Sequence, residues 1–272
     1  MDMKNLFYIL LALSLFSCST NDDAIERTQA ELEPDKGYIF EMDYRFSTMP
    51  SPEKYYQFTY ENNRLKSMLG KYYYSTGIGG FFNSNVLTQL TYTSNKVQVD
   101  HFGPEGFVTY GTVIYLMENN RPIKAEKYVN NTAGYPSYLE TSKSYTYDQD
   151  KIVTYQKNGG WELYTSYYFD SKKNLIKSEV LEKTGGVDNK ITTTTYSDFD
   201  NAANPFKKLY LINDDFYEKS LSTNNFRAKE TISQYLPNPA NGNMTYPPGH
   251  SSSQWSYKYD TNGQVLLYFP YP

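Results

Sequence analysis

The feature that most constrains the fold is a short unit of alternating aromatic residues that recurs along the chain. In each unit, an aromatic segment runs into a turn of Asn, Asp, Ser or Gly, and a second apolar segment follows. Asn, Asp and Gly tolerate the positive φ angles of tight turns, so the pattern is typical of β-hairpins. The predicted hairpins lie within residues 56–67, 90–99, 113–124, 145–154, 167–176 and 255–267.

Within the first strand of each hairpin, the aromatic residues share one parity. Tyr56, Phe58 and Tyr60, for example, alternate with Gln57 and Thr59. Because successive side chains of a strand point to opposite faces, the pattern predicts one aromatic face and one wet face. The chain also has 30 tyrosines against two tryptophans, and tyrosine favours strands. We therefore predict an all-β fold, an antiparallel meander of repeated β-hairpins that forms a curled sheet or a soluble barrel.

A membrane pore is the competing β architecture. Its strands need an outward band of apolar residues. Here we expect the residues on the non-aromatic face to be Thr, Ser, Gln and Lys. Lys143 and Lys258 would lie on this face in mid-strand, where a charge that faces lipid is costly. We therefore expect a soluble β structure.

One segment breaks the β pattern. Asn204 is a suitable helix cap, Pro205 suits the first helical position, and Phe206 and Leu209 fall on one face. The sequence predicts a short helix within residues 205–219. Pro and Gly are dense in residues 237–253, which predicts a long irregular loop.

The N-terminus has the layout of a secretory signal. Lys4 precedes an apolar run of 11 residues, Leu6 to Phe16, which is shorter than the ~20 residues that a spanning helix needs. The string Leu15-Phe16-Ser17-Cys18 resembles the lipobox of bacterial lipoproteins. That resemblance implies cleavage before Cys18 and lipid attachment to it. The alternative is a buried cysteine in a signal anchor.

Three regions follow from this interpretation. Residues 1–17 are the signal peptide, 18–36 a flexible acidic tether, and 37–272 a single β-repeat domain. The acidic pair Asp22-Asp23 resembles the surface-export signal of Bacteroidota lipoproteins, and a merely solvated linker is the alternative. We expect an outer membrane lipoprotein of the cell envelope, facing either the periplasm or the cell surface.

A wider resemblance covers most of residues 37–272. It rests on the lipobox, the Tyr-x-Tyr-turn-Leu hairpins, and the stretch 196–201 followed by Asn204-Pro205-Phe206. The hairpin unit resembles the tyrosine–aspartate repeats of bacterial toxin shells. The whole chain resembles a family of Bacteroidota lipoproteins of unknown function with a porin-like β fold. The resemblance implies a fold and a cellular localisation, and it supplies no catalytic residues.

Charge and cysteine content exclude several classes. The formal net charge is −4, and removal of residues 1–17 leaves it at −4. Nucleic-acid binding needs a basic face, and so does a polybasic membrane patch, so neither is expected. Cys18 is the only cysteine, which rules out an intramolecular disulfide.

The sequence contains no motif for catalysis or for a metal or cofactor. HExxH, CxxC and GxSxG strings are missing, as is a glycine-rich phosphate loop. We interpret His101 and His250 as solvated loop residues. We therefore expect neither a metal nor a cofactor.

Paired carboxylates are the remaining route to an enzyme, because a glycosidase needs two of them. Glu41 and Asp43 share parity, which fits an ordinary wet face better. Asp198 and Asp200 alternate, but they lack the glycine and distal glutamate of a calcium loop and indicate a turn. The pair Asp214-Asp215 is expected at a solvent-facing helix end.

Aromatic residues near flexible glycines are the best candidates for ligand contact, because an exposed ring stacks on a sugar. Trp161 follows Gly159-Gly160 and is expected at a hairpin tip. Tyr73 and Phe82 flank a glycine-rich stretch and are expected on a loop, and Tyr246 lies in the Pro-rich segment. For any one of these rings, core packing is the competing interpretation.

The sequence thus favours a non-enzymatic lipoprotein, anchored in a membrane through its N-terminal lipid, with a binding or scaffolding role. Its partner would be a glycan or a protein. The alternative is a carboxylate-dependent glycoside hydrolase, which would require two acidic residues that converge in a cleft.

Overall fold

The computed structural model describes residues 31–43, 47–75, 79–103, 108–129, 137–238 and 246–269. These residues belong to a unit that extends from Glu31 to Pro272. The expected signal peptide, Cys18 and most of the expected tether lie outside the described residues. So do the side chains of Glu41 and Asp43.

The unit consists almost entirely of strands. Their bounds in chain order are β1 (Lys36–Asp43), β2 (Ser47–Glu61), β3 (Arg64–Ser75), β4 (Gly79–Tyr92), β5 (Lys96–Phe102), β6 (Val108–Glu118), β7 (Arg121–Val129), β8 (Tyr138–Tyr147), β9 (Lys151–Asn158), β10 (Trp161–Phe169), β11 (Leu175–Thr184), β12 (Val187–Phe199), β13 (Phe226–Tyr235), β14 (Gly249–Gln254), β15 (Lys258–Tyr259) and β16 (Val265–Phe269). The one helix among the described residues is α2 (Asp214–Leu221), between β12 and β13.

The strands form one sheet with a simple order. From β1 to β14, each strand pairs with the next one in the chain, and all of these pairs are antiparallel. Beyond β1, the C-terminal strand β16 pairs in parallel, with Gly37 opposite Leu267, and β15 follows. Among the described residues no pairing joins β14 to β15, so the sheet is open. The prediction of an antiparallel, curled all-β meander is confirmed.

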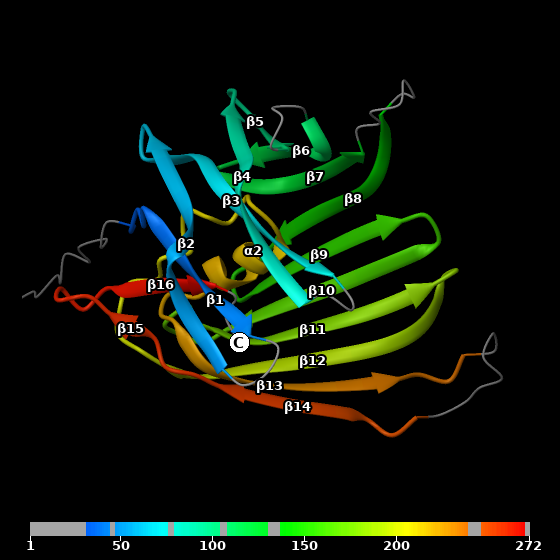
Figure 1. The fold of residues 1–272 in the computed structure, drawn as a ribbon. Coiled ribbons are helices and arrows are strands. Elements are labelled where there is room, and N and C mark those ends of the chain that lie inside the picture. Colours follow the sequence, from blue (N-terminus) through cyan, green and yellow to red (C-terminus); the bar gives the residue numbers. More distant parts are fainter. Residues whose placement is uncertain are drawn as a thin grey trace, which may run out of the picture. The chain divides into compact units, whose positions relative to one another are not determined.

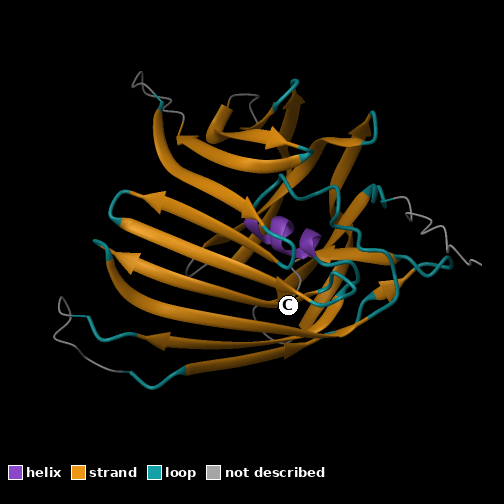
Figure 2. Ribbon diagram, turned by 180° about the vertical axis from the view of Figure 1, so that it is seen from behind, coloured by secondary structure: helices purple, strands orange, loops and turns teal. Residues whose placement is uncertain are grey.

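The sheet curls around α2, which lies on its concave side (Figure 1, Figure 2). Tyr115, Tyr145, Tyr167 and Tyr196 from four different strands are buried on this inner face. They belong to one core with Phe216 and Tyr217 of α2 and with the turns that precede the helix. The hairpins therefore bury their aromatic parity against a segment from late in the chain.

The hairpin turns have the predicted chemistry. Asn62 and Asn63 both have positive φ, +50° and +63°, and Asn119 and Asn120 repeat this with +49° and +60°. Two consecutive left-handed residues match the right-handed twist of the flanking strands, and asparagine tolerates that conformation better than most residues.

The predicted two faces are confirmed, with one correction. Phe58 and Tyr145 are buried, whereas Gln57, Thr59 and Thr146 are exposed. The assignment of Lys143 to the wet face is wrong. Lys143 has the parity of Tyr145 and is buried on the inner face, where it meets an acidic side chain of α2.

A short helix is confirmed, but it begins later than predicted. The N-cap is Asn213, whose side chain accepts a hydrogen bond from the Phe216 amide at 2.9 Å. Asn204 instead donates to the carbonyls of Lys219 and Ser222, both at 2.8 Å. Because Asn204 satisfies carbonyls at the C-terminal end of α2, it does not start a helix, and residues 205–211 form turns.

Two connecting segments also differ from expectation. The C-terminal part of the predicted loop 237–253 is strand β14, which pairs with β13. At the other end of the chain, the Tyr60 hydroxyl donates to the Pro34 carbonyl at 3.0 Å, and the Phe58 amide donates to the Asp35 carbonyl at 2.9 Å. The last residues of the expected tether therefore lie against the sheet. No helix in the described residues is long and apolar enough to cross a membrane.

Candidate ligand-binding cleft

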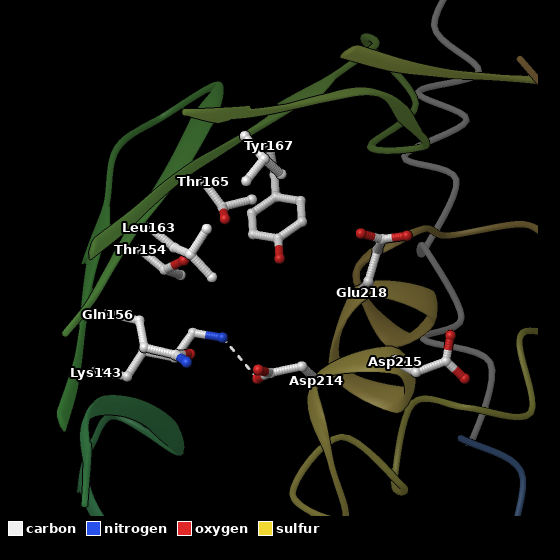
Figure 3. Close-up of a pocket in the computed structure, with 10 residues that line it drawn as sticks. Lys143, Thr154, Gln156, Leu163, Thr165, Tyr167, Asp214, Asp215 and Glu218 are labelled. Carbon is white, nitrogen blue, oxygen red and sulfur yellow. Dashed lines mark hydrogen bonds and ion pairs between the residues drawn. The ribbon is translucent and has the colours of Figure 1, made fainter. Parts of the chain in front are cut away.

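A cleft of about 240 Å³ lies between the inner face of the sheet and the N-terminal part of α2 (Figure 3). Its floor consists of side chains that strand pairing places side by side on β8, β9 and β10. Lys143 in β8 is paired with Gln156 in β9, which is paired with Leu163 in β10. One row deeper, Thr154 is paired with Thr165. The residues that line the cleft are Lys143, Thr154, Gln156, Leu163, Thr165, Tyr167, Val180, Asp214, Asp215 and Glu218.

An ion pair closes one side of the cleft. The Lys143 ammonium lies 2.6 Å from the Asp214 carboxylate (Figure 3). The Lys143 side chain is only 10% exposed, whereas that of Asp214 is 63% exposed. The pair therefore presents a carboxylate to solvent at the mouth, with the ammonium behind it. Asp215 lies on the same first helical turn and pairs with Lys219 at 3.0 Å.

A second carboxylate lies deeper. Glu218 accepts a hydrogen bond from the Tyr196 hydroxyl at 2.7 Å, and the Tyr196 and Ser178 hydroxyls are 2.9 Å apart. Burial raises the pKa of the Glu218 carboxyl, and the hydrogen bond from Tyr196 opposes that rise. Glu218 and Asp214 are four residues apart, so they share one face of α2. The prediction that Asp214-Asp215 lies at a solvent-facing helix end is confirmed in part, because Asp214 is exposed but also lines the cleft.

The residues that line the cleft can form hydrogen bonds with a ligand that carries many hydroxyl groups. Thr165 and Gln156 supply a hydroxyl and an amide group that donate and accept hydrogen bonds, whereas Thr154 is buried. Leu163 and Val180 add apolar surface between them. A concave site that combines apolar walls with a few convergent polar groups is the usual form of a small-molecule site.

Trp161 is where the sequence predicts it. It is the first residue of β10, directly after the Gly159-Gly160 turn, and its side chain is 38% exposed. It has the parity of Leu163 and Thr165, so it lies on the face that carries the cleft. Whether it contacts a ligand stays a prediction.

The expected loop around Tyr73 and Phe82 is wrong in part. Tyr73 lies inside β3 and Phe82 inside β4, and the two strands pair up to Ser75 and Gly79. Phe82 is half-buried, with its ring edge-on to Tyr56 at 5.3 Å between centroids. It is therefore a packing residue. The side chain of Tyr73 lies outside the described ones.

Tyr246, the weaker candidate, is exposed. Its side chain is 49% exposed, and its ring lies edge-on to Tyr235 at 5.6 Å between centroids. It is not among the residues that line the cleft.

Both histidines lie on strands, so the expectation of loop positions is wrong. His101 is in β5 and its Nδ1 is 2.9 Å from the Thr88 hydroxyl. Burial lowers the pKa of His101 to about 4, and Lys71 adds to that effect. His250 is in β14 and lies 2.7 Å from Glu230.

The turn predicted for Asp198 and Asp200 is wrong in part, because Asp198 lies inside β12 and only Asp200, which accepts a hydrogen bond from the Ala202 amide at 3.2 Å, follows the strand. Asp198 has φ +56° and accepts a hydrogen bond from Arg227 at 2.5 Å. Asp200 accepts from the Asn225 amide and side chain, both at 3.1 Å. Among the described residues, no cluster of His, Cys, Asp and Glu has a metal-binding arrangement.

Sequence reasoning missed the cleft, although a signal was present. On the inner parity of β9 and β10, Thr154, Gln156 and Thr165 stand where other strands carry aromatic residues such as Phe58 and Tyr145. In this stretch the residues of the inner parity line the cleft and do not belong to the aromatic core.

No protein-family model matches the chain, and no curated protein matches it. Among solved structures, it is similar to a porin-like protein from Bacteroides vulgatus, with 12% identity, a TM-score of 0.45, and coverage of 79% of this chain and 86% of that chain. It is also similar to a porin-like protein from Bacteroides uniformis, with 14% identity, a TM-score of 0.42, and coverage of 78% and 79%. Both of these structures are porin-like β proteins from Bacteroides.

Proposed function

We propose that the chain is a cell-envelope lipoprotein that binds a carbohydrate, without chemical conversion, in the cleft between the sheet and α2. The lipid on Cys18 holds it at the outer membrane, and the curled sheet presents the cleft. The observation that carries the proposal is the cleft on the inner face of the sheet, which polar side chains of β9 and β10 line, with an exposed tryptophan farther along the same face of β10.

The physical argument concerns what a sugar needs. A saccharide offers hydroxyl groups that donate and accept in several directions, and a ring face that stacks on an aromatic side chain. Gln156, Thr165 and the Lys143–Asp214 pair supply the hydrogen bonds. Trp161, farther along the same face of β10, supplies a ring for a second sugar unit.

A binding experiment on the full-length chain tests the proposal. A glycan array selects a ligand, and calorimetry then compares wild type with Gln156→Ala and Trp161→Ala. Each variant should lose about 1–3 kcal/mol of binding free energy, as interface hot spots do. Lys157→Ala is the matched control, because Lys157 is next to Gln156 and points to the opposite face. It should leave the affinity unchanged.

Thermal melts accompany the isotherms. Trp161 is exposed at a hairpin tip, so Trp161→Ala should barely change the melting temperature. If that substitution unfolds the protein, Trp161 is a core residue and its role as a sugar platform fails. If an array of glycans gives no ligand while an envelope protein binds the cleft, the partner is a protein and the carbohydrate proposal is wrong.

One observation favours a second candidate, a glycoside hydrolase. Asp214 and Glu218 converge on the cleft from one helix face, and the pKa of Glu218 is raised, as that of a general acid is. Release of reducing ends from the bound glycan would identify this activity. Glu218→Gln and Asp214→Asn should each abolish the release if the carboxylates act as acid and nucleophile or base. No release by wild type supports the binding proposal.

Anchoring has its own test. Cys18→Ser should abolish incorporation of a palmitate analogue and move the protein into the periplasmic soluble fraction, because stable anchoring takes more than one acyl chain and all of them depend on this residue. Continued labelling of the serine variant would contradict the lipobox interpretation.

A further inference from the structure

Two hairpins of the sheet carry the same tetrapeptide. Glu-Asn-Asn-Arg occupies residues 61–64, between β2 and β3, and again residues 118–121, between β6 and β7. Both asparagine pairs form the left-handed turn described above. Each arginine is thus placed at the same point of its hairpin, as the first residue of the second strand.

Each arginine lies over a tyrosine ring of a neighbouring hairpin. The guanidinium of Arg64 is 5.2 Å from the centre of the Tyr92 ring, and that of Arg121 is 5.4 Å from the centre of the Tyr147 ring. The two tyrosine hydroxyls are held alike. Tyr92 donates to the carbonyl of Leu65, the residue after Arg64, at 2.8 Å, and Tyr147 donates to the carbonyl after Arg121, also at 2.8 Å.

This stacking orients the guanidinium without using its hydrogen-bonding capacity. A ring contacts only the flat face of the group, and its five N–H donors point outward in the plane. In the described part of the chain, the side chains of Arg64 and Arg121 have no hydrogen bond and no ion pair. Both side chains are exposed. Two preoriented guanidinium groups are therefore available to bind an anion.

The turns before α2 bring a third cation to the same place. Tyr210 donates to the Asn120 carbonyl at 3.3 Å, and Lys208 contacts Asn63, so this segment crosses the tips of both hairpins. Lys208 is neutralised by Glu33 at 2.6 Å. Lys207, the residue before it, has no hydrogen bond or ion pair among the described residues.

Lys207 lies where two clefts meet. A cleft of about 450 Å³ contains Arg121, and one of about 380 Å³ contains Arg64. Both are lined by Asn120, Lys207 and Tyr210, and also by the acidic residue Glu31. The larger cleft adds the apolar walls of Ile152 and Phe169. Neither cleft shares a lining residue with the cleft at the N-terminal part of α2, which is proposed above to bind a carbohydrate.

Lys207 is mostly protonated at neutral pH, although its surroundings weaken its hold on the proton. Burial lowers the pKa of its ammonium to about 8, and the Glu31 carboxylate opposes that shift. The other charges at the larger cleft are Arg121, Asp148, and Lys173, which pairs with Asp150 at 3.2 Å. An incoming anion would stabilise the charged form of Lys207.

We propose that the two joined clefts bind an acidic saccharide, with its carboxylate or sulfate groups on Arg64 and Arg121 and with Lys207 between them. The planar fork of an arginine matches the paired oxygens of a carboxylate or sulfate. The apolar and tyrosine walls suit a sugar ring. A nucleic acid is disfavoured because the chain carries a net charge of −4 and the clefts also hold the carboxylates of Glu31 and Asp148.

The test measures binding to the full-length chain by calorimetry. The probes are trigalacturonate, a sulfated chondroitin disaccharide, neutral maltotriose, and inorganic sulfate. At least one acidic saccharide should bind, and Arg64→Gln, Arg121→Gln and Lys207→Gln should each weaken it about ten- to hundredfold, the effect of losing a charged hydrogen bond. Lys172→Gln is the matched control, because it removes the same charge from an exposed turn outside both clefts. It should leave binding unchanged.

Several results would overturn the proposal. They are equal affinity for maltotriose, equal weakening by Lys172→Gln, inorganic sulfate binding as tightly as the saccharides, and no binding of either acidic probe at roughly 1 mM. Melting temperatures check that the glutamine variants fold. Gln156→Ala, which tests the carbohydrate cleft, should not affect these probes. The two sites can therefore fail or succeed separately.

Discussion

The Lys143 ammonium lies 2.6 Å from the Asp214 carboxylate and joins β8 to the first turn of α2, across 71 residues of chain. The same ammonium lies over the rings of Tyr145 and Tyr217, at 5.5 and 5.8 Å from their centres. The cation is thus held between an aromatic core and one partly exposed anion. This arrangement fixes the position of the helix against the sheet.

Removal of the anion should therefore destabilise the fold. Asp214→Asn leaves a nearly buried ammonium without its charge partner, which is costly. Because the Asp214 side chain is 63% exposed, water offsets part of the loss, and we expect a cost of about 1–2 kcal/mol. Urea unfolding measures it.

Asp215→Asn is the control for that prediction. It removes the same charge from the same helical turn, but its partner Lys219 is an i,i+4 neighbour on the same helix, so this pair does not join the helix to the sheet. Such pairs contribute about 0.3–0.5 kcal/mol. Equal losses for the two variants would mean that the helix dipole, and not the contact with Lys143, sets the cost.

The aromatic face should not tolerate a carboxylate. Tyr196 is buried and donates to Glu218 at 2.7 Å, so Tyr196→Asp places a second acid beside a buried one. We expect a loss of several kcal/mol in the free energy of unfolding. Ser197→Asp, one residue on and exposed on the other face, should cost less than about 1 kcal/mol. Similar losses would contradict the two-faced sheet.

Gly111 should be irreplaceable. Its φ is +106°, and a Cβ at this position would meet the backbone carbonyl of Tyr128 on the neighbouring strand β7. Backbone cannot move aside cheaply, so Gly111→Ala should cost about 1–3 kcal/mol or more in thermal or urea unfolding. Gly160→Ala is the control, because open space surrounds Gly160 and its φ is not left-handed. It should be close to neutral.

His101 should contribute to acid sensitivity. Its pKa in the folded protein is about 4, below the usual 6.5, so between these values the unfolded chain binds more protons than the folded one. Stability is therefore lost as the pH falls from about 6.5 to 4. His101→Gln should reduce the loss between pH 7 and 4.5 by about 1–2 kcal/mol, measured by urea unfolding at both values. An unchanged loss in the variant would show that other groups dominate.

The sequence by itself determined the strands, their turns and the face that each strand buries. These features depend on residues within one hairpin. Alternation of Tyr56, Phe58 and Tyr60 sets one face, and the left-handed Asn62 and Asn63 set the turn. The break in that alternation at Thr154, Gln156 and Thr165 was also present in the sequence, although its meaning depends on what lies opposite.

The tertiary structure alone decided where the polar side chains meet. Asn204 looked like a helix cap because it precedes proline, and its side-chain oxygen does accept from the Phe206 amide, but its side-chain nitrogen donates to carbonyls at the C-terminal end of α2. Lys143 meets Asp214, and Lys207 comes between Arg64 and Arg121, only because one segment crosses the concave side of the curled sheet. Such contacts join residues dozens of positions apart, and their geometry follows from strand register and sheet curvature, which no local pattern encodes.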